Sequence, residues 1–203
     1  MDMQMTERPR YDPDIHHRRS IRLQGYDYSR EGAYFVTICT HNREDLFGSV
    51  GAGSKPAQST KPAQSPAQKS VLSMQMTLND YGEIVQQAWD DLVNHIEGIY
   101  LDAFVVMPNH IHGIVVIDEH VDLTNRAGLE PAPTLSEIIR QLKTFSARRI
   151  NKGRGTPGFP VWQRNYHERI IRGENELKQI REYIASNPAN WLRDENNLVT
   201  LIS

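Results

Sequence analysis

The sequence predicts an α+β domain with a ferredoxin-like plan: an antiparallel sheet with helices on one face, and one extra helix near the C-terminus. The main observation is the order of the patterned segments, which is strand, helix, two strands, helix, strand and helix. A length of 203 residues with 38% hydrophobic residues suffices for one such core. No apolar run approaches the roughly 20 residues that span a bilayer, so we expect a soluble, cytoplasmic protein without a membrane partner.

A strand and a low-complexity insertion follow each other in the first third of the chain. Ala33 to His41 is rich in aromatic and β-branched residues and predicts a strand buried on both faces. Gly48 to Ser70 is rich in Pro, Ala, Gln and Ser, which cannot pack a core and predict a flexible surface loop. We therefore expect a tail at 1–17, a single domain over 18–198 with a loop inserted at about 49–70, and a second tail at 199–203.

A helix and a hairpin of two strands are predicted in the middle of the chain. From Asn79 to Ile96 apolar residues recur every three or four positions, which is typical of an amphipathic helix, and Asn79 or Asp80 would cap it. Two strands follow, at Ile99 to Met107 and at His110 to Ile117. The tight Met-Pro-Asn connection between them predicts a hairpin.

Two further helices and a strand complete the predicted domain. Thr134 to Glu137 has the pattern of a capping box and begins a helix. The apolar residues that this helix turns inward are Leu135, Ile138, Ile139, Leu142 and Phe145. Val161 to Ile171 predicts a strand after a link rich in Gly and Pro, and Glu174 to Ser186 predicts the last helix, which we expect Pro188 to stop.

The net charge of −2 conceals a strong segregation of charge along the chain. Between Leu78 and Leu123 there are nine acidic residues and no Lys or Arg. Between Ser136 and Arg172 there are nine basic residues against two acidic ones, a net charge of +7. Such a segment can follow a phosphate backbone whatever the total charge, because binding responds to the local potential. A solvated helix face is the alternative, and charge alone does not decide between them.

His110 and His112 begin a predicted strand and lie two residues apart, so both side chains project from the same face while Ile111 points into the opposite layer. Two imidazoles side by side on a rigid strand could bind a divalent metal, although unconnected polar positions are the alternative. Two ionisable rings among Val and Ile are costly unless they are paired or coordinated. The single Cys39 excludes an internal disulfide and a zinc site built from several cysteines, and we expect it to be buried without a role.

The last predicted helix places Tyr183 and Asn187 four residues apart, on one flank of its buried stripe. A phenol and an amide carbonyl would then face the same direction. A tyrosine beside a core stripe and an asparagine before a proline are also ordinary structural features. Tyr166 is the main rival tyrosine, but it falls in a predicted strand, and we interpret it as structural or DNA-contacting.

Three motifs together resemble the IS200-like transposases and, within them, the REP-associated tyrosine transposases of the HUH endonuclease superfamily. They are RRSIRLQGYDYSREGAYFVTICTHNRE, MPNHIHGIVVI and YIASNP, and the resemblance covers most of the chain from Arg18 to Trp191. It implies an HUH fold in which His110, Ile111 and His112 form the histidine-hydrophobic-histidine element. It also implies that Tyr183 is the single nucleophile.

The resemblance further implies a metal-dependent DNA strand cleavage and rejoining reaction through a 5′-phosphotyrosine intermediate. The metal would be Mg²⁺ or Mn²⁺, held by His110, His112 and Asn187. Most IS200-like enzymes carry Gln in place of this asparagine, whereas the REP-associated branch has Asn.

Single-stranded or hairpin DNA is the implied partner, bound by a monomer or a homodimer that would be nucleoid-associated in a bacterial cell. Trp162, Gln163 and Arg164 could stack on and hydrogen-bond to unpaired bases, or anchor the last helix instead. The basic residues expected to contact DNA are Arg18, Arg19, Arg22, Arg140, Lys143, Arg148, Arg149, Lys152 and Arg164. Two other functions stay open: a catalytically silent hairpin-binding regulator derived from such a transposase, and an unrelated phosphodiesterase that uses water as its nucleophile.

Overall fold

The computed structural model describes residues 31–52, 74–118 and 133–194. Its main sheet has four strands in the order β4-β5-β1-β6, and all neighbouring strands are antiparallel. The elements are β1 (Gly32–Cys39), η1 (His41–Arg43), β2 (Gly48–Ala52), β3 (Met74–Leu78), α1 (Asp80–Asp90), α2 (Leu92–His95), β4 (Ile99–Met107), β5 (His110–Ile117), α3 (Leu135–Arg154), β6 (His167–Ile171), α4 (Glu174–Asn190) and η3 (Trp191–Arg193). The predicted ferredoxin-like plan with an added C-terminal helix is confirmed.

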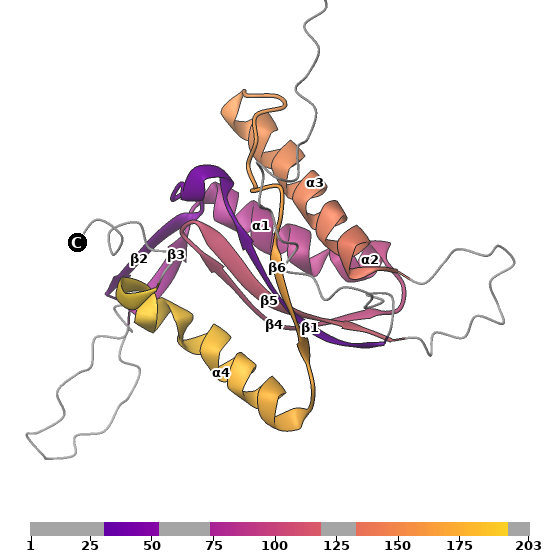
Figure 1. Cartoon of the computed structure of the whole chain (residues 1–203). Helices are drawn as coiled ribbons and strands as arrows, with labels where there is room; N and C mark the ends of the chain where they lie inside the picture. The colour runs from indigo at the N-terminus through magenta and orange to yellow at the C-terminus, as the bar shows by residue number, and fades with distance from the viewer. Residues whose placement is uncertain (1–30, 53–73, 119–132, 195–203) are drawn as a thin grey trace, which may run out of the picture.

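Helices cover both faces of this sheet (Figure 1). The α1 and α3 helices pack against each other on one face, whereas α4 lies on the other. Because successive strand residues point to opposite faces, Ile111 of β5 joins the core beneath α1 and α3, while Ile114 packs against Ile184 of α4. His110 and His112 follow the same alternation as Ile114 and therefore face α4. The extra helix thus covers the face that carries the histidines.

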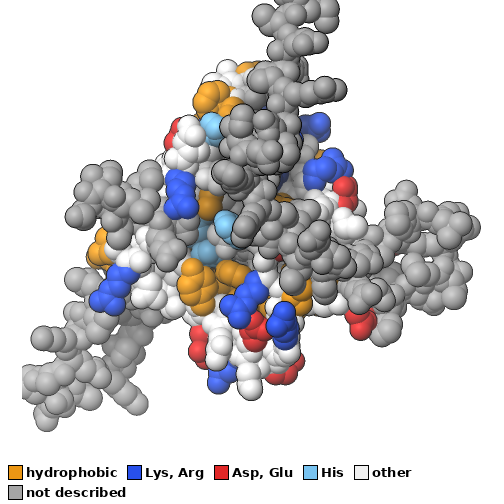
Figure 2. Space-filling view, viewed as in Figure 1, with side chains coloured by type: hydrophobic (Ala, Val, Ile, Leu, Met, Phe, Trp, Pro, Cys, Tyr) orange, Lys and Arg blue, Asp and Glu red, His pale blue; other side chains and the backbone are white. Residues whose placement is uncertain are grey.

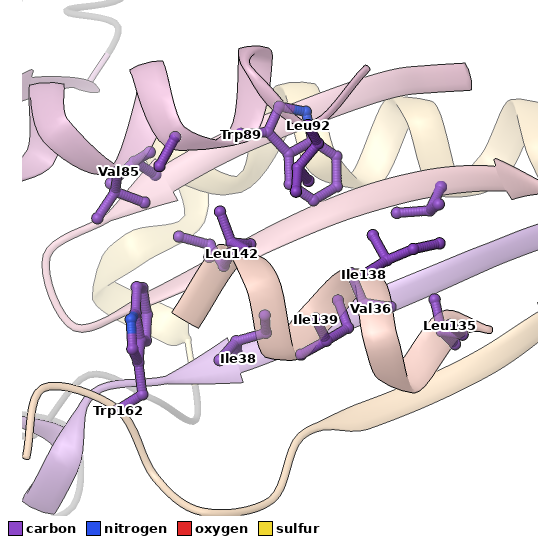
Figure 3. Packing of buried hydrophobic residues seen from close by; sticks show 14 of the residues in the cluster. Val36, Ile38, Val85, Trp89, Leu92, Leu135, Ile138, Ile139, Leu142 and Trp162 are labelled. Atoms are coloured by element: carbon purple, nitrogen blue, oxygen red, sulfur yellow. The ribbon is translucent and has the colours of Figure 1, made fainter. Parts of the chain in front are cut away.

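The larger core lies between the sheet and the α1–α3 layer, and Figure 3 shows its centre. Trp89 of α1 stacks on Phe104 of β4 with the ring centroids 4.3 Å apart. Gly113 of β5 makes room for this pair, because a Cβ there would lie 2.4 Å from the Trp89 ring. The other labelled side chains of this core are Val36, Ile38, Val85, Leu92, Leu135, Ile138, Ile139, Leu142 and Trp162.

A second, two-stranded sheet was not predicted from the sequence. The β2 strand pairs with β3 in antiparallel register, with Val50 opposite Met76. Residues 49–52 of the expected loop are therefore a strand, and residues 53–70 lie outside the described part of the chain. Alternating Gly and small residues conceal the strand, which exists through its pairing with a partner some 25 positions away.

The α1 and α3 helices begin where the sequence predicts, but the helix that was expected to run from Asn79 to Ile96 is interrupted. The Asn79 side chain caps α1, because its Oδ1 accepts hydrogen bonds from the backbone amides of Tyr81 and Gly82, both at 3.0 Å. The predicted helix to Ile96 breaks at Asp91 into α1 and α2. The Thr134 side chain caps α3, as expected. No helix in the described segments is long and apolar enough to cross a membrane.

Three sequence expectations about side chains and ends are wrong. Phe145 is exposed rather than inward, because it lies at the edge of α3, where its ring contacts His95. The α4 helix continues through Pro188 to Asn190, since proline fits helical backbone angles and a buried Trp191 anchors the following turn. From Ala33 to Ile38, β1 alternates half-buried and buried residues, so one of its faces is only partly buried, whereas burial on both faces was expected.

The last strand is shorter than predicted. Val161 to Ile171 was expected to be continuous, but β6 begins at His167, and Trp162 makes only an isolated bridge to Thr40. Between them the chain folds around Lys143 of α3. Its ammonium donates to the backbone carbonyls of residues 163, 164 and 165, at 3.0, 3.3 and 3.1 Å. The chain leaves the sheet where this contact is made, and an extended-strand pattern does not reveal a side-chain contact of this kind.

Candidate active site

The two histidines of β5 meet on the α4 face of the sheet. Both are buried, with 0% of His110 and 2% of His112 exposed, and their Nε2 atoms lie 3.1 Å apart. The sequence spacing predicts that they share a face, and the structure confirms this. Flanking strands on both sides hold β5, so the two rings are carried by the interior of the sheet.

Each histidine has its outer ring nitrogen held by a neighbouring polar side chain. His110 Nδ1 lies 2.9 Å from Asn109 Oδ1, and His112 Nδ1 lies 2.8 Å from Thr37 Oγ1. Asn109 Nδ2 donates to the Arg43 carbonyl, so Asn109 Oδ1 is oriented to accept a hydrogen bond from His110 Nδ1. The Nε2 atom of His110 is then left with its lone pair directed at His112. Such outer partners orient imidazoles that bind metals.

Burial keeps both histidines neutral. It lowers the pKa of His110 to about 4, an effect that the Asp194 carboxylate partly offsets. Burial and the neighbouring His110 lower the pKa of His112 well below its ordinary value. Two neutral imidazoles with converging Nε2 atoms form an electron-rich site that suits a cation.

Tyr183 reaches this pair from α4. Its hydroxyl lies 3.3 Å from His112 Nε2, and its ring centroid lies 5.2 Å from that of His112. Phe35 of β1 stacks on His112 and contacts Tyr183 edge-on, with ring centroids 5.4 and 6.0 Å apart. Tyr183 is nevertheless 47% exposed, so a large substrate can reach it. This chain's tyrosine therefore completes a group with this chain's own histidines.

The rival Tyr166 lies elsewhere. It packs against the α1–α3 core, and its hydroxyl lies 3.4 Å from Ser136 Oγ of α3. The Lys143 ammonium lies 5.4 Å from its ring centroid. Tyr166 thus packs between the edge of the sheet and α3, on the face opposite the histidines.

Asn187 lies one turn beyond Tyr183 and is buried beside a carboxylate that the sequence did not single out. It is 2% exposed, and its Nδ2 donates to Asp194 Oδ2 at 3.3 Å. Among the described residues, no donor reaches its Oδ1, which is buried. Asp194 Oδ2 also lies 3.9 Å from His110 Nε2. The sequence contains no clear signal for Asp194, because this residue lies in extended backbone after η3 and reaches Asn187 only through the turn that follows α4.

These groups fit a divalent metal ion. One ligand atom from each of His110, His112 and Asp194 lies within 4.8 Å of the others. The 3.1 Å between the histidine nitrogens suits two ligands at about 2.1 Å from a shared ion, meeting it at roughly a right angle. The unsatisfied Asn187 Oδ1 is a further oxygen donor. A mixture of imidazole, carboxylate and amide oxygen suits Mn²⁺ or Mg²⁺ better than it suits soft metals.

The position of α4, and so of Tyr183, depends on packing and on one ion pair. Ile180 and Ile184 are buried against the sheet, at about 1.5–3 kcal/mol for each side chain. Arg181 donates to Asp102 at 2.8 Å, next to a register shift between β4 and β5 that follows Leu101. That pair is largely solvated and contributes less, about 0–1 kcal/mol. Apolar packing therefore holds the helix, and the ion pair aligns it.

The basic residues predicted to bind DNA divide into three groups. Arg18, Arg19 and Arg22 lie outside the described residues. Arg140 and Arg149 project from α3 and face carboxylates, those of Glu137 and Asp91. Lys143, Arg148, Lys152 and Arg164 line a cleft beside the C-terminal half of α3.

The surface of α4 differs from that cleft in its charge. Arg169 pairs with Glu176 at 2.6 Å at the beginning of the helix. Figure 2 shows Lys and Arg side chains mixed with Asp and Glu over this end of the molecule. The tyrosine helix is therefore not itself a basic surface.

Comparisons with known proteins find chains that are similar to this one. A protein of Haemophilus influenzae, described only as uncharacterized, is 39% identical over 196 residues, which are 92% of this chain and 96% of that protein. One similar solved structure is a REP-associated tyrosine transposase bound to a REP hairpin, at 17% identity and a TM-score of 0.49, covering 84% of this chain and 74% of that one. Another is a candidate transposase of Deinococcus radiodurans, at 18% identity and a TM-score of 0.41, covering 82% and 96%.

The family assignment rests on the sequence match. The family model described as "Transposase IS200 like" matches residues 67–187, more than half of the chain. The matched region contains the two histidines, Tyr183 and Asn187. The chain belongs to the IS200-like transposase family.

Proposed function

We propose that this protein is a metal-dependent, single-strand DNA transposase of the REP-associated branch, which cleaves and rejoins hairpin-bearing DNA through Tyr183. The observation that carries the proposal is the Tyr183 hydroxyl, 3.3 Å from His112 Nε2 and beside two converging neutral imidazoles. A half-exposed phenol next to a buried cation site suits a polymeric phosphodiester, because the backbone can approach while the ligands stay shielded from water.

The chemistry assigns one role to each group. His110, His112 and Asn187, with Asp194 as a fourth candidate, would hold Mg²⁺ or Mn²⁺, which would supply charge stabilisation for the scissile phosphate. The Tyr183 oxygen gives up its proton and bonds to phosphorus, and the 3′ oxygen leaves and takes up a proton. The products are a 5′-phosphotyrosine and a free 3′-OH. Because the ester is retained, a 3′-OH can reverse the step and rejoin strands without ATP.

Phe35 and the core of α4 supply positioning. The Phe35 ring contacts both His112 and Tyr183, so it limits how far the phenol can swing from the metal ligands. Since one chain contains all of these groups, we propose that a monomer has a complete site. Mass photometry of the protein during catalysis would test this.

The decisive experiment compares two tyrosine variants on single-stranded hairpin DNA from the flanks of the gene. In Mn²⁺ or Mg²⁺ the parent protein should form a covalent adduct, visible as a shifted band on a denaturing gel. Tyr183→Phe should form none and still bind the DNA. Tyr166→Phe, the matched control, should retain the adduct, since that hydroxyl lies on the other face of the sheet.

Other outcomes would select other functions. An adduct that persists in Tyr183→Phe contradicts the assignment of the nucleophile. Cleavage that leaves a free 5′-phosphate and no linked protein would indicate a phosphodiesterase with a water nucleophile. Hairpin binding with no cleavage by the parent protein in either metal would indicate a silent DNA-binding regulator.

A further inference from the structure

A cleft separate from the histidine site lies between the C-terminal half of α3 and the segment that follows it. Its volume is about 720 Å³, within the roughly 300–1,000 Å³ typical of small-ligand pockets. The side chains that line it come from two stretches, 143–152 and 157–164. Those used below are Lys143, Arg148, Lys152, Phe159, Trp162 and Arg164.

The cleft is strongly positive, and three of its cations are available to a ligand. No Asp or Glu lines it. In the described part of the chain, the side chains of Arg148, Lys152 and Arg164 have neither an ion pair nor a hydrogen bond. Lys143 differs, because its ammonium is held by the carbonyls of residues 163–165. Lys143 therefore shapes the wall of the cleft, and the other three cations remain for an anion.

An exposed aromatic ring, that of Phe159, also lines this cleft. Phe159 is 48% exposed, although it is a large apolar side chain. The Arg154 guanidinium lies 4.9 Å from its ring centroid, and the His41 ring contacts it edge-on at 6.4 Å. The Asn151 amide donates to the Phe159 carbonyl at 2.8 Å. Arg154 thus lies over one face of the ring and His41 contacts it, which restricts the ring before a base stacks on its other face and lowers the entropic cost of stacking.

The cleft wall is connected to the strand beside the histidines. The Gln163 amide donates to the Cys39 carbonyl at 2.9 Å, and Cys39 pairs with His110 across β1 and β5. Trp162 bridges to Thr40, whose hydroxyl donates to the Asn109 carbonyl at 3.0 Å. The two sites therefore lie at the same end of the sheet, on either side of it.

We propose that this cleft binds an unpaired nucleotide of the DNA substrate, with its base stacked on Phe159 and its phosphates bound by Arg148, Lys152 and Arg164. A base within a duplex has no free face, so an exposed ring lined by cations selects single-stranded DNA. The proposal rests on the proposed function, in that the ligand is taken to be the strand that is cleaved. It adds a second contact point, which would fix the register of that strand relative to Tyr183.

Fluorescence anisotropy with labelled dT12 and with an abasic strand of the same length tests the proposal. Phe159→Leu keeps the apolar bulk and removes the aromatic face. It should weaken binding of dT12 by roughly 5- to 100-fold and leave the abasic strand nearly unaffected, because only stacking is lost. Arg148→Ala should weaken binding of both strands and reduce the slope of log affinity against log salt by about 0.7.

Lys178→Ala is the matched control, since it removes one exposed positive charge at a residue of α4 that does not line the cleft. Thermal melts check that each variant is folded. Parent-like binding of dT12 by both Phe159→Leu and Arg148→Ala would overturn the proposal, as would no binding of dT12 by the parent protein. Adduct formation by the cleft variants at saturating hairpin DNA reports on Tyr183 chemistry instead, so failure of the two proposals can be told apart.

Discussion

Burial of His110 predicts that the metal-free protein loses stability as the pH falls below about 6.5. The folded pKa is about 4, against an ordinary value of 6.5. Between these values the unfolded chain binds a proton that the folded chain does not, so protonation favours unfolding. The stability is therefore greatest above pH 6.5 and declines toward pH 4. From these two pKa values, His110 contributes a loss of about 2 kcal/mol between pH 7.5 and pH 5.0.

Urea unfolding in EDTA at the two pH values measures this loss. The His110→Gln variant is the comparison, because glutamine does not titrate in this range, and groups other than the adjoining His112 change about equally in both proteins. The parent protein should lose about 2 kcal/mol more than the variant. An equal loss in both proteins would refute the conclusion that His110 is buried and neutral.

The same experiment with saturating Mn²⁺ probes the proposed metal site. Metal binding requires neutral histidines, and burial lowers the pKa of His110 to about 4 and that of His112 well below its ordinary value, so both stay largely neutral in the folded protein at pH 5.0. Saturating Mn²⁺ should therefore raise stability by a similar amount at pH 7.5 and at pH 5.0, and the decline between these values should match that in EDTA. In His110→Gln, Mn²⁺ should add little stability at either pH.

Three further predictions concern packing, metal affinity and the bent segment before β6. Gly113→Ala should lower the free energy of unfolding by about 1–3 kcal/mol in urea, because the new Cβ would lie 2.4 Å from the Trp89 ring. Asp194→Asn should weaken Mn²⁺ binding in calorimetry by about tenfold or more, since a carboxylate beside the histidines is lost. Lys143→Met should speed hydrogen exchange around residues 163–165 and cost about 1 kcal/mol of stability, because three carbonyls lose their donor.

Each of these changes has a matched control in the same chain. Gly51→Ala should be nearly neutral, since nothing lies within 4 Å of a Cβ there, and an equal cost at both glycines would contradict the packing argument. Asp90→Asn, an exposed change on α1, should leave Mn²⁺ affinity unchanged. Arg149→Met removes a charge from α3 without touching residues 163–165, so similar exchange in both variants would count against Lys143 as the organiser of that segment.

Local patterns were sufficient for the centre of the sheet. The strands at 99–107 and 110–117 have the predicted bounds, because β-branched residues and a tight turn are signals contained within a few positions. The shared face of His110 and His112 follows from the two-residue period of any strand. The stripe of α4 likewise places Tyr183 and Asn187 on one side of the helix.

Features that depend on distant partners could not be predicted from the sequence. The β2 strand has a weak pattern and exists through its pairing with β3. The continuation of α4 past Pro188 depends on burial of Trp191, whose ring lies 5.9 Å from that of His110. That continuation brings Asp194 within 3.9 Å of His110, so one missed helix end concealed a candidate metal ligand.

The sequence by itself determined which residues are candidates for the active site, because a strand period, a helix period and a family motif are all local properties of the chain. Only the tertiary structure decided that α4 covers the histidine face, that Tyr183 rather than Tyr166 adjoins His112, and that Lys143 is used within the protein. These outcomes depend on which surfaces become buried together. Burial is a property of the whole packed chain, and no short segment contains it.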